Sequence, residues 1–505
     1  MKKIFFLSFF VLFTLPVLSQ DKGIDQKIDE AFKPFSDFFS SKVFFNIGDN
    51  PFVIYLLVFS AAFFTLYFLF PNIRYFGIAI NVVRGKYDKL EKSDPEDGEV
   101  SHFQALATAV SGTVGNGNIA GVALAIALGG PGATFWMIVC GLIGMSTKFV
   151  ECTLGVHYRD VDENGIVYGG PMYYLSKGLK EKGFKTLGKI AAVIFAVCCI
   201  GGSFGGGNAA QSNQAAIVIK DLLGYDSTFA GAMIGIILAL VVGVIIIGGI
   251  KRIASVTEKV VPFMALLYIV ACIYILSVNF SFLDDAIALI FKEAFNPTAM
   301  GVGGFIGVLM IGFQRAAFSN EAGAGSASIA HSAVKTKYAA SEGLVALLEP
   351  FIDTVVICTM TALVIITFNS TGTFMYGGQG GVLIDGVLYE GAGITSKAFA
   401  EYIPYSDIFL TVAVVLFAVS TMISWSYYGL QSWKYLFGRG EISDLTYKLL
   451  FLVFVVIGSA ASMNSIWAFS DAMIFAMVFP NMIGLYILFP VVKKELKKYL
   501  KAIKN

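Results

Sequence analysis

A stretch rich in glycine and asparagine, Ser111-Gly-Thr-Val-Gly-Asn-Gly-Asn118, interrupts an apolar run between about residues 102 and 128. The run is long enough to cross a bilayer as a helix, but its centre disfavours a continuous helix. Unpaired backbone groups are costly in hydrocarbon, so irregular backbone survives there only where it lines a cavity or binds something. The stretch therefore predicts a broken transmembrane helix whose free carbonyls and amides bind a small polar solute and a cation. A close helix crossing through small residues is the structural alternative.

The composition is that of a membrane protein. Of the 505 residues, 56% are hydrophobic and only 14% are charged, which is not a soluble composition. The net charge of +1 gives no reason to expect nucleic acid as a partner, because the basic residues lie in loops between apolar runs. All six cysteines fall inside apolar segments, which predicts small buried side chains and neither disulfides nor a metal site.

The N-terminus has the layout of a signal peptide, predicted at residues 1–19. Lys2 and Lys3 precede an apolar core that ends near Leu15 and is too short to span a membrane comfortably. An uncleaved anchor is the alternative. Residues 20–50 mix polar residues with phenylalanine, which predicts a short external amphipathic segment.

The remaining chain predicts an all-α membrane protein with eleven transmembrane helices. An extra span and a cytoplasmic linker occupy residues 51–100, followed by five spans in 101–278, an external amphipathic helix in 279–299, five spans in 300–491 and a basic tail in 492–505. Within the second half, residues 382–389 alternate around Asp-Gly, which predicts a small hairpin. The predicted spans are 51–73, 102–128, 132–155, 188–219, 229–248, 256–278, 300–330, 342–368, 406–436, 446–463 and 466–491.

Lysine and arginine are distributed unevenly between the loops on the two sides. The loop after span 1, the loop at 156–189 and the C-terminal tail are rich in them, whereas the opposite loops after span 1 hold only Lys220, Lys292 and Lys397. This bias predicts a cytoplasmic C-terminus. Eleven spans then place the N-terminus outside, in agreement with the signal peptide. The predicted location is the inner (plasma) membrane of a bacterium.

A second interruption lies in span 7, where the stretch from Gly312 to Ser326 carries Arg315 and Glu321 within an apolar run. Span 2 enters from the cytoplasm and span 7 from outside, so the two broken helices are antiparallel, and each opens a set of five spans. Paired interrupted helices at corresponding positions indicate a transporter binding site between two inverted halves. The repeat is inferred from topology, because the halves share no visible residue-level similarity.

Charged residues inside the predicted spans require partners. Arg315 is expected to pair with Glu321, or either of them with Asp353, and a structural ion pair is the favoured interpretation over a functional one. Lys148 and Glu151, near the inner end of span 3, are predicted to be interfacial residues that extend to the membrane surface.

Several motifs together point to one family: Thr108-Ala-Val-Ser-Gly-Thr-Val-Gly-Asn-Gly-Asn-Ile-Ala-Gly121, Gly129-Gly-Pro-Gly-Ala133, Gly169-Gly-Pro-Met-Tyr-Tyr174, Gly206-Gly-Asn-Ala-Ala-Gln-Ser-Asn213, Phe318-Ser-Asn-Glu-Ala-Gly323, Ile329-Ala-His-Ser332, Phe351-Ile-Asp-Thr354 and Cys358-Thr-Met-Thr-Ala-Leu363. Over most of residues 100–435 the chain resembles the alanine or glycine:cation symporter family, which are sodium-coupled carriers. The resemblance implies the LeuT-type 5+5 inverted repeat over spans 2–6 and 7–11, with discontinuous spans 2 and 7.

The backbone of the first break suits the two charged ends of an amino acid. The amides of Asn116 and Gly117, which open the outer half of span 2, direct a positive helix end at a carboxylate. Gly115 and Gly117 let a ligand approach the backbone closely. Carbonyls near Thr113 and in the second break are the expected acceptors for the ammonium.

Side chains complete the predicted substrate site. Phe318 and Trp425 are expected to wall the side-chain pocket, and an indole that closes it favours alanine or glycine. The resemblance adds Gln211 as a polar contact and Ser319 beside Phe318. Ordinary packing is the alternative for Trp425, and contact between helices is the alternative for Gln211.

A sodium ion requires oxygen ligands. A second cation site beside Thr113 and Asn118 is an open alternative, and no carboxylate is obvious at the main site. The ligand set that the resemblance implies for the main site comprises the carbonyls of Ser111 and Val114 and the hydroxyls of Ser420 and Thr421.

The sequence therefore predicts a sodium-coupled symporter that carries alanine or glycine into the cell by alternating access, with no organic cofactor and no enzymatic activity. A proton-coupled carrier of the same fold is the alternative, with Asp353, Glu321 or Glu349 as its titratable group. An intramembrane protease is disfavoured because the sequence has neither the paired-aspartate motif nor the zinc-ligand pattern of such enzymes. A non-transporting sensor is a third alternative, which a measurement of flux in proteoliposomes would separate from a carrier. The oligomeric state is left open.

Overall fold

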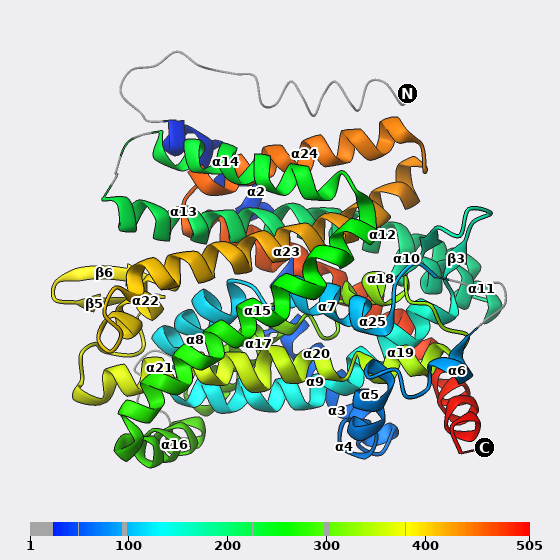
Figure 1. Ribbon diagram of the computed structural model, residues 1–505, viewed down its shortest axis with the longest axis horizontal. Helices are drawn as coiled ribbons and strands as arrows, with labels where there is room; N and C mark the ends of the chain where they lie inside the picture. Colours follow the sequence, from blue (N-terminus) through cyan, green and yellow to red (C-terminus); the bar gives the residue numbers. More distant parts are fainter. Residues whose placement is uncertain are drawn as a thin grey trace.

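The computed structural model describes residues 24–504 apart from residues 49, 93–97, 225, 226, 228, 297–303 and 379. The predicted signal peptide lies outside the described residues. Long helices run side by side through most of the molecule, and short strand pairs lie at its opposite ends (Figure 1). The longer helices are α2 (Ile24–Val43), α3 (Phe52–Tyr67), α7 (His102–Thr113), α9 (Gly132–His157), α12 (Lys185–Phe204), α13 (Ala210–Leu223), α14 (Ala230–Ile246), α15 (Gly249–Val278), α16 (Phe280–Phe295), α17 (Gly304–Asn320), α21 (Thr359–Phe368), α23 (Ser406–Phe437), α24 (Glu441–Ala460) and α25 (Met463–Ala502).

Shorter elements connect these helices. They are β1 (Asn46–Ile47), β2 (Asn50–Pro51), α4 (Pro71–Arg74), α5 (Phe76–Val83), α6 (Asp88–Glu91), η1 (Gly117–Gly121), α8 (Val122–Gly129), β3 (Asp160–Val161), β4 (Val167–Tyr168), α10 (Pro171–Tyr173), η2 (Tyr174–Gly178), α11 (Leu179–Glu181), η3 (Gly205–Ala209), α18 (Ala327–His331), α19 (Ala339–Val345), α20 (Leu348–Pro350), η4 (Phe351–Cys358), η5 (Asn369–Thr371), β5 (Gly381–Ile384), β6 (Val387–Glu390) and α22 (Ala392–Ala400).

Helix occupies every stretch predicted to span the membrane. By length and composition, seven helices of the described chain are suited to cross a bilayer, and the bent pair of α7 with Gly117–Gly129 makes an eighth candidate. The apolar helices α3 and α14 are shorter, with 16 and 17 residues. The count of eleven spans and the inverted repeat therefore remain predictions.

The break in span 2 is confirmed. A capping box at Ser101 starts α7, because Ser101 Oγ accepts from the Gln104 amide and Gln104 Oε1 accepts from the Ser101 amide. The backbone leaves the helix at Val114, and the wide turn η1 then leads into α8 at an angle of 51° to α7. The helix hydrogen bonds are therefore interrupted between Val114 and Gly117, deep in the protein.

The break in span 7 is confirmed as well. After α17 ends at Asn320, Glu321, Gly323 and Gly325 adopt positive φ angles of 55°, 97° and 88° before α18 begins. Left-handed backbone suits glycine, whereas it is uncommon for a glutamate. Glu321 is one of five non-glycine residues with positive φ among the described residues, and it is the one that lies in a helix break.

Two predicted surface elements have the expected form. Residues 280–295 form the amphipathic helix α16, with Ala286 and Ile290 buried beneath it. Strands β5 and β6 pair in antiparallel register around Asp385 and Gly386, as the alternation predicts. The amphipathic segment near the N-terminus is the helix α2, whose phenylalanines surround Phe469 of α25.

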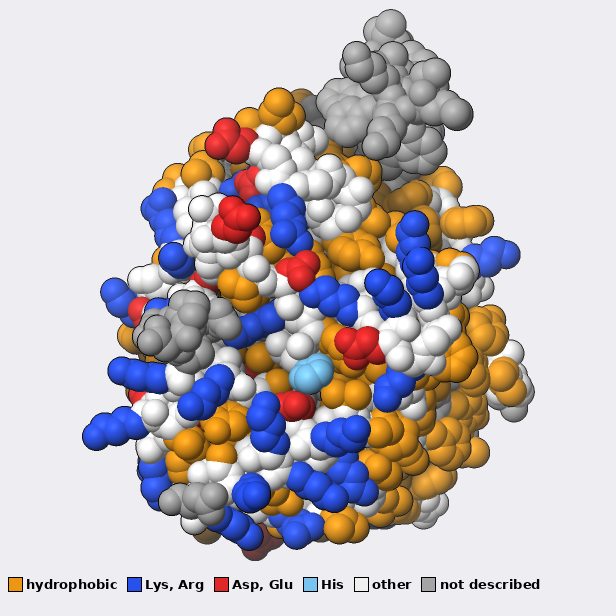
Figure 2. All heavy atoms as spheres, turned by 90° about the vertical axis from the view of Figure 1, so that its right-hand side faces the viewer, with side chains coloured by type: hydrophobic (Ala, Val, Ile, Leu, Met, Phe, Trp, Pro, Cys, Tyr) orange, Lys and Arg blue, Asp and Glu red, His pale blue; other side chains and the backbone are white. Residues whose placement is uncertain are grey.

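One end of the molecule is strongly basic. Figure 2 shows lysine and arginine side chains gathered over the end of the bundle that carries α10, α11 and the C-terminus in Figure 1. The opposite end carries the β5–β6 hairpin and α16 (Figure 1). The elements at the basic end, or basic face, carry exposed lysines, among them Lys89 of α6, Lys180 of α11 and Lys497 near the end of α25 (Figure 1).

The interfacial positions predicted for Lys148 and Glu151 are wrong. Both side chains are completely buried on α9. The Lys148 ammonium lies 3.0 Å from Glu349 Oε1, and Glu151 Oε1 accepts a hydrogen bond of 2.7 Å from the Asn481 amide. Partners from distant parts of the chain therefore compensate charges that otherwise must reach water.

Close packing of α19 on α9 provides a test of the fold. In Gly343→Ala, the added Cβ lies 1.9 Å from Thr153 Oγ1 and 2.8 Å from the Phe149 carbonyl oxygen. We expect destabilisation by about 1–3 kcal/mol, because a tightly packed interface must open. The measurement is the thermal unfolding midpoint of the purified protein. Gly440→Ala is the control, because no heavy atom lies within 4 Å of its Cβ, and an equal midpoint for both variants contradicts the packing.

Candidate functional site

A small cavity lies where the two breaks face each other. Its volume is about 10 Å³, roughly the space of one water molecule. A Cβ on Gly117 of the first break would lie 3.4 Å from the Ser319 Cα of the second. The lining residues are Gly112, Thr113, Gly117, Gly206, Gln211, Phe318, Ser319, Glu321, Thr421, Trp425 and Ile474. Six of the eight predicted substrate residues therefore line one cavity, and Gly115 and Asn116 adjoin it through Gln211.

Gln211 of α13 satisfies the backbone of the first break. Its Oε1 accepts from the Asn116 amide at 3.0 Å, and its own carbonyl accepts from Asn116 Nδ2 at 3.1 Å. In this structure the Asn116 amide therefore donates to Gln211, and its donation to a substrate carboxylate stays a prediction that requires an exchange of partners. A Cβ on Gly115 would lie 2.4 Å from Thr421 Oγ1 and 3.0 Å from Gln211 Oε1, so this approach requires glycine.

Oxygen atoms of α7 and α23 meet at the inner side of the break. Thr421 Oγ1 lies 3.0 Å from the Ser111 carbonyl and 3.5 Å from the Val114 carbonyl, and its hydroxyl donates to them. Ser111 Oγ in turn donates to the Ser420 carbonyl at 2.7 Å, while the Ser420 hydroxyl donates to the Phe417 carbonyl at 3.0 Å. All four residues of the predicted main cation set are therefore neighbours, but Ser420 meets Ser111 through its backbone carbonyl, while its predicted hydroxyl bonds the Phe417 carbonyl and Met264 Sδ. The atoms available to coordinate an ion are neutral carbonyl and hydroxyl oxygens, which suit a hard monovalent cation.

Asn118 takes part in a different cluster, centred on Asp353. Its Nδ2 donates to Asp353 Oδ1 at 2.7 Å, and its Oδ1 accepts from the Gly115 amide at 2.9 Å. Ser319 Oγ donates to Asp353 Oδ2 at 2.9 Å. The sequence interpretation found no carboxylate near the site, although an aspartate inside a predicted span was the available signal. Thr113 donates to carbonyls of its own helix at 3.3 Å, so its hydroxyl is not part of this cluster.

Glu321 brings a carboxylate to the cavity wall. Its Oε1 accepts a hydrogen bond of 2.9 Å from the Trp425 indole, and its Oε2 accepts one from Ser326 Oγ. The indole packs so closely on η3 that a Cβ on Gly207 would lie 2.1 Å from its Cγ. Trp425 is therefore held in one orientation by both a hydrogen bond and packing. The sequence indicated Glu321 as a structural ion or as the titratable group of a proton-coupled carrier, and it gave no signal for the contact with Trp425.

An aromatic stack covers the cavity on the side of α17. The rings of Phe318 and Trp467 are stacked with centroids 5.0 Å apart. The Arg315 guanidinium lies 5.6 and 5.8 Å from these two ring centroids, and it pairs with Asp471. The predicted pairing of Arg315 with Glu321 or Asp353 is therefore wrong, because α25 supplies the partner.

Comparison with known proteins identifies relatives over most of the chain. The model of the "Sodium:alanine symporter family" matches residues 38–505. The sodium/alanine symporter AgcS of Methanococcus maripaludis is 40% identical over 457 residues, which cover 90% of this chain and 96% of that protein. The putative sodium/proton-dependent alanine carrier protein YrbD of Bacillus subtilis is 36% identical over 419 residues, covering 81% and 82%. A manganese transporter from Eremococcus coleocola has a similar fold, with a TM-score of 0.50 at 13% identity over 76% of this chain and 78% of that chain.

Proposed function

Because the chain belongs to the sodium:alanine symporter family, whose members are transporters and not enzymes, we propose that it carries a small neutral amino acid, alanine or glycine, into the cell together with sodium. The observation that carries the proposal is the contact of Thr421 with the broken end of α7. One hydroxyl of α23 lies within 3.0 Å of the Ser111 carbonyl and 3.5 Å of the Val114 carbonyl. A sodium ion placed among these oxygens links the two helices and the break itself.

The substrate site is assigned to the adjoining cavity. The carboxylate lies at the start of η1, where Gly117 presents backbone to the cavity. The ammonium lies toward the carbonyls of the two helix ends and toward the Glu321 carboxylate. Phe318 and Trp425 enclose the side chain together with Ile474. The cavity of about 10 Å³ is too small even for alanine, so the lining side chains must move apart on binding, and the smallest side chains require the least movement.

Coupling follows from shared structure. Sodium orders the main chain between Ser111 and Val114, and the same break continues into Gly115 and Gly117 beside the substrate. Binding of one ligand therefore raises the affinity for the other by an equal factor. Symport requires that the empty and the doubly loaded carrier change orientation more readily than a carrier that holds one ligand.

The orientation proposed for the membrane follows from the basic face. A cytoplasmic basic face agrees with the excess of lysine and arginine that bacterial membrane proteins carry on that side (Figure 2). This places the C-terminal end of α25 in the cytoplasm and the β5–β6 hairpin outside (Figure 1). The N-terminus then lies outside, and the protein is a multi-pass protein of the bacterial inner membrane.

Removal of the Thr421 hydroxyl tests the sodium site. Thr421→Val keeps the shape of the side chain but removes one oxygen, and we expect the sodium concentration for half-maximal alanine uptake to rise about tenfold or more. Thr421→Ser restores the oxygen and is expected to restore uptake. Thr411→Val, on the same helix but bonded to the Val218 carbonyl at 3.4 Å, is the control. Unchanged sodium dependence in Thr421→Val contradicts the assignment.

Replacement of the indole tests the pocket. Trp425→Phe removes the donor to Glu321 and enlarges the cavity, so we expect alanine uptake to fall roughly tenfold and amino acids with larger side chains to compete better. Competition by each of the twenty amino acids in proteoliposomes is the measurement. Trp433→Phe is the control. Trp433 lies farther along α23, and the substitution removes its hydrogen bond of 3.0 Å to Ser443 Oγ. An unaltered competition profile argues against Trp425 as a pocket wall.

Sodium and proton coupling are separated by ion replacement. The relative named sodium/proton-dependent and the buried carboxylates Asp353 and Glu321 make proton coupling the second candidate. In proteoliposomes at fixed pH, we expect uptake of labelled alanine to fall to background when choline replaces sodium. An inward proton gradient is expected not to restore it. Uptake in choline driven by that gradient supports the proton-coupled carrier instead.

A further inference from the structure

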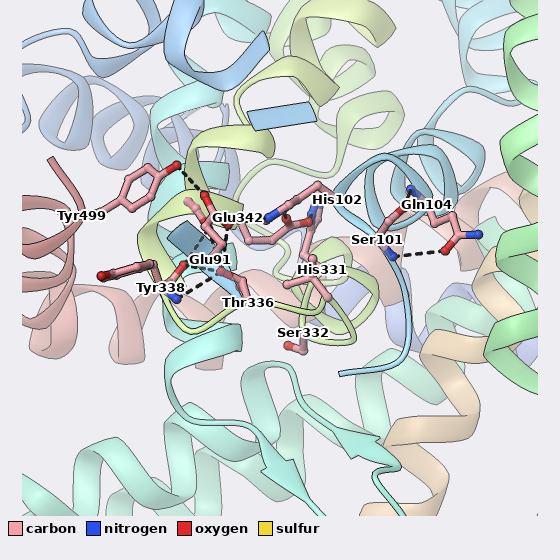
Figure 3. A network of polar contacts seen from close by, with 12 residues as sticks. Glu91, Ser101, His102, Gln104, His331, Ser332, Thr336, Tyr338, Glu342 and Tyr499 are labelled. Carbon is pink, nitrogen blue, oxygen red and sulfur yellow. Dashed lines mark hydrogen bonds and ion pairs between the residues drawn. The ribbon is translucent and has the colours of Figure 1, made fainter. Parts of the chain in front are cut away.

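A ladder of buried charged side chains lies near the basic face, apart from the substrate cavity. Figure 3 shows the end of the ladder nearest the protein surface, where His102, Glu342 and Glu91 meet. The exposed fraction of each side chain is 8% or less. The ladder residues, in spatial order, are Glu91 of α6, His102 of α7, Glu342 of α19, His331 of α18, Glu349 of α20 and Lys148 of α9.

Each histidine of the ladder lies between two carboxylates. His102 Nε2 is 2.7 Å from Glu91 Oε2, and His102 Nδ1 contacts Glu342 Oε2. His331 Nδ1 is 2.5 Å from Glu342 Oε1, and His331 Nε2 is 3.5 Å from Glu349 Oε2. An ionised carboxylate only accepts hydrogen bonds, so a ring with a carboxylate at both nitrogens must donate from both. Beside ionised carboxylates the His102 ring therefore carries two protons and is an imidazolium ion. His331 donates to Glu342 from Nδ1, and its Nε2 lies within ion-pair distance of Glu349 Oε2 without a hydrogen bond, which favours the charged ring by electrostatics alone.

Counted over its six side chains alone, the ladder is neutral when both histidines are protonated. Three carboxylates contribute three negative charges, and Lys148 contributes one positive charge. Protonated His102 and His331 supply the remaining two. Loss of either proton leaves a buried carboxylate without compensation and two carboxylates held near a neutral ring. Unpaired buried charge is strongly destabilising, which gives the protonated ladder its rigidity.

The cytoplasmic end of the ladder is open to water. Glu91 and His102 line a cleft of about 390 Å³ on this side of the molecule. Glu91 also accepts from Tyr499 of α25 at 2.6 Å and from Thr336 at 3.0 Å (Figure 3). Protons can therefore exchange at His102 through the cleft.

The other titratable or charged groups that face the ladder are Arg84, Asp88, Lys92 and Lys335 in the cleft, Tyr499 of α25, Arg159 beside the carbonyls after α18, and Glu151, Cys152 and Glu321 around Lys148.

The ladder holds the helix that forms the inner wall of the transport site. His102 is the first residue of α7, and the same helix ends at Thr113 in the cavity after contributing the Ser111 carbonyl. Through His102, α7 is tied to α6 and α19, and through Glu342 to α18. The opposite side of α7 contacts α15 through Gln104 and Glu258 at 3.0 Å. Inward opening must displace α7 from one of these two groups of partners.

We propose that this ladder is a proton-binding latch, in which protons taken up from the cytoplasm at His102 and His331 hold the inner half of α7 closed. Loss of a proton into the cleft makes the ladder repulsive, frees α7 and favours opening toward the cytoplasm. The protons are not carried with the substrate, so internal pH sets the rate of the cycle without adding to its driving force. The effect of the latch on a transport cycle rests on the proposed function. The closure of α7 by protonation does not.

A cysteine that becomes accessible when α7 moves tests the latch without substrate. Ala109 is completely buried in α7, about one turn before the break. Ala109→Cys is placed in a Cys198→Ala background, because the other native cysteines are buried. A membrane-impermeant thiol reagent is applied from the cytoplasmic side at about pH 6 to about pH 11, a range that extends above that of ordinary histidines because neighbouring carboxylates favour the charged ring. Rates are normalised to Lys182→Cys on the exposed surface, since thiol reactivity itself depends on pH.

We expect the normalised labelling of Ala109→Cys to rise roughly tenfold or more with increasing internal pH. His102→Gln and His331→Gln are expected to label rapidly at every pH, because Gln cannot supply the missing charge. The charge-balanced pair His102→Gln/Glu342→Gln is expected to label slowly with a reduced pH dependence. His157→Gln is the control, because His157 is the third histidine of the chain and pairs with Glu495 at 3.6 Å on the surface.

Labelling that is independent of pH in the parent chain overturns the latch, and this titration decides the question even if a histidine variant fails to fold. Loss of pH dependence in His157→Gln alone also overturns it. The readout requires neither sodium nor alanine, so failure of the proposed transport function leaves it unaffected. Conversely, suppose that alanine uptake depends on sodium but not on internal pH, and that labelling is independent of pH. This result contradicts the latch and supports the sodium-coupled symporter.

Discussion

The structure depends on how one stretch of open backbone is satisfied inside a membrane protein. Between Val114 and Gly117 the chain gives up helical hydrogen bonds where hydrocarbon offers no replacement. Gln211 accepts from the Asn116 amide, and Thr421 donates to the carbonyl of Ser111. These contacts recruit α13 and α23 to the break. The same polar groups that stabilise the interruption can exchange partners with an amino acid and a cation, so stability and binding share one set of atoms.

Buried charges organise the rest of the interior in a similar way. Arg315 pairs with Asp471 above the Phe318 ring, Lys148 pairs with Glu349, and the two buried histidines each bridge two carboxylates. The Arg315–Asp471 and Lys148–Glu349 pairs join helices that are distant in sequence, whereas His331 joins the consecutive helices α18, α19 and α20. Such pairs are weak sources of net stability, but breaking one partner is costly, so they restrict the arrangements that the bundle can adopt. A transporter that changes shape between a few states needs this kind of restriction.

Sequence reasoning located the broken helices and most of the cavity because those features are local. Glycine and asparagine within an apolar run mark a break without knowledge of any neighbour, and the resemblance placed Gln211 and Thr421 opposite it. The polar partners were predicted less well. Asp353 and Glu321 were recognised as charges inside spans, yet their contacts with Asn118 and with Trp425 depend on helix packing. Lys148 was placed at the interface because its partner Glu349 lies far along the chain.

The sequence by itself determined that the chain is an apolar helical membrane protein with two interruptions, because hydropathy and backbone preference act over a few neighbouring residues. It also determined the asymmetry of basic residues between the two sides. Only the tertiary structure decided which charge meets which. Asp471 reaches Arg315, the Asn116 amide is occupied by Gln211, and His102 reaches Glu342 because helices that are distant in sequence pack side by side. Hydrogen bonds and ion pairs act over a few ångströms in space, and sequence separation does not specify that distance.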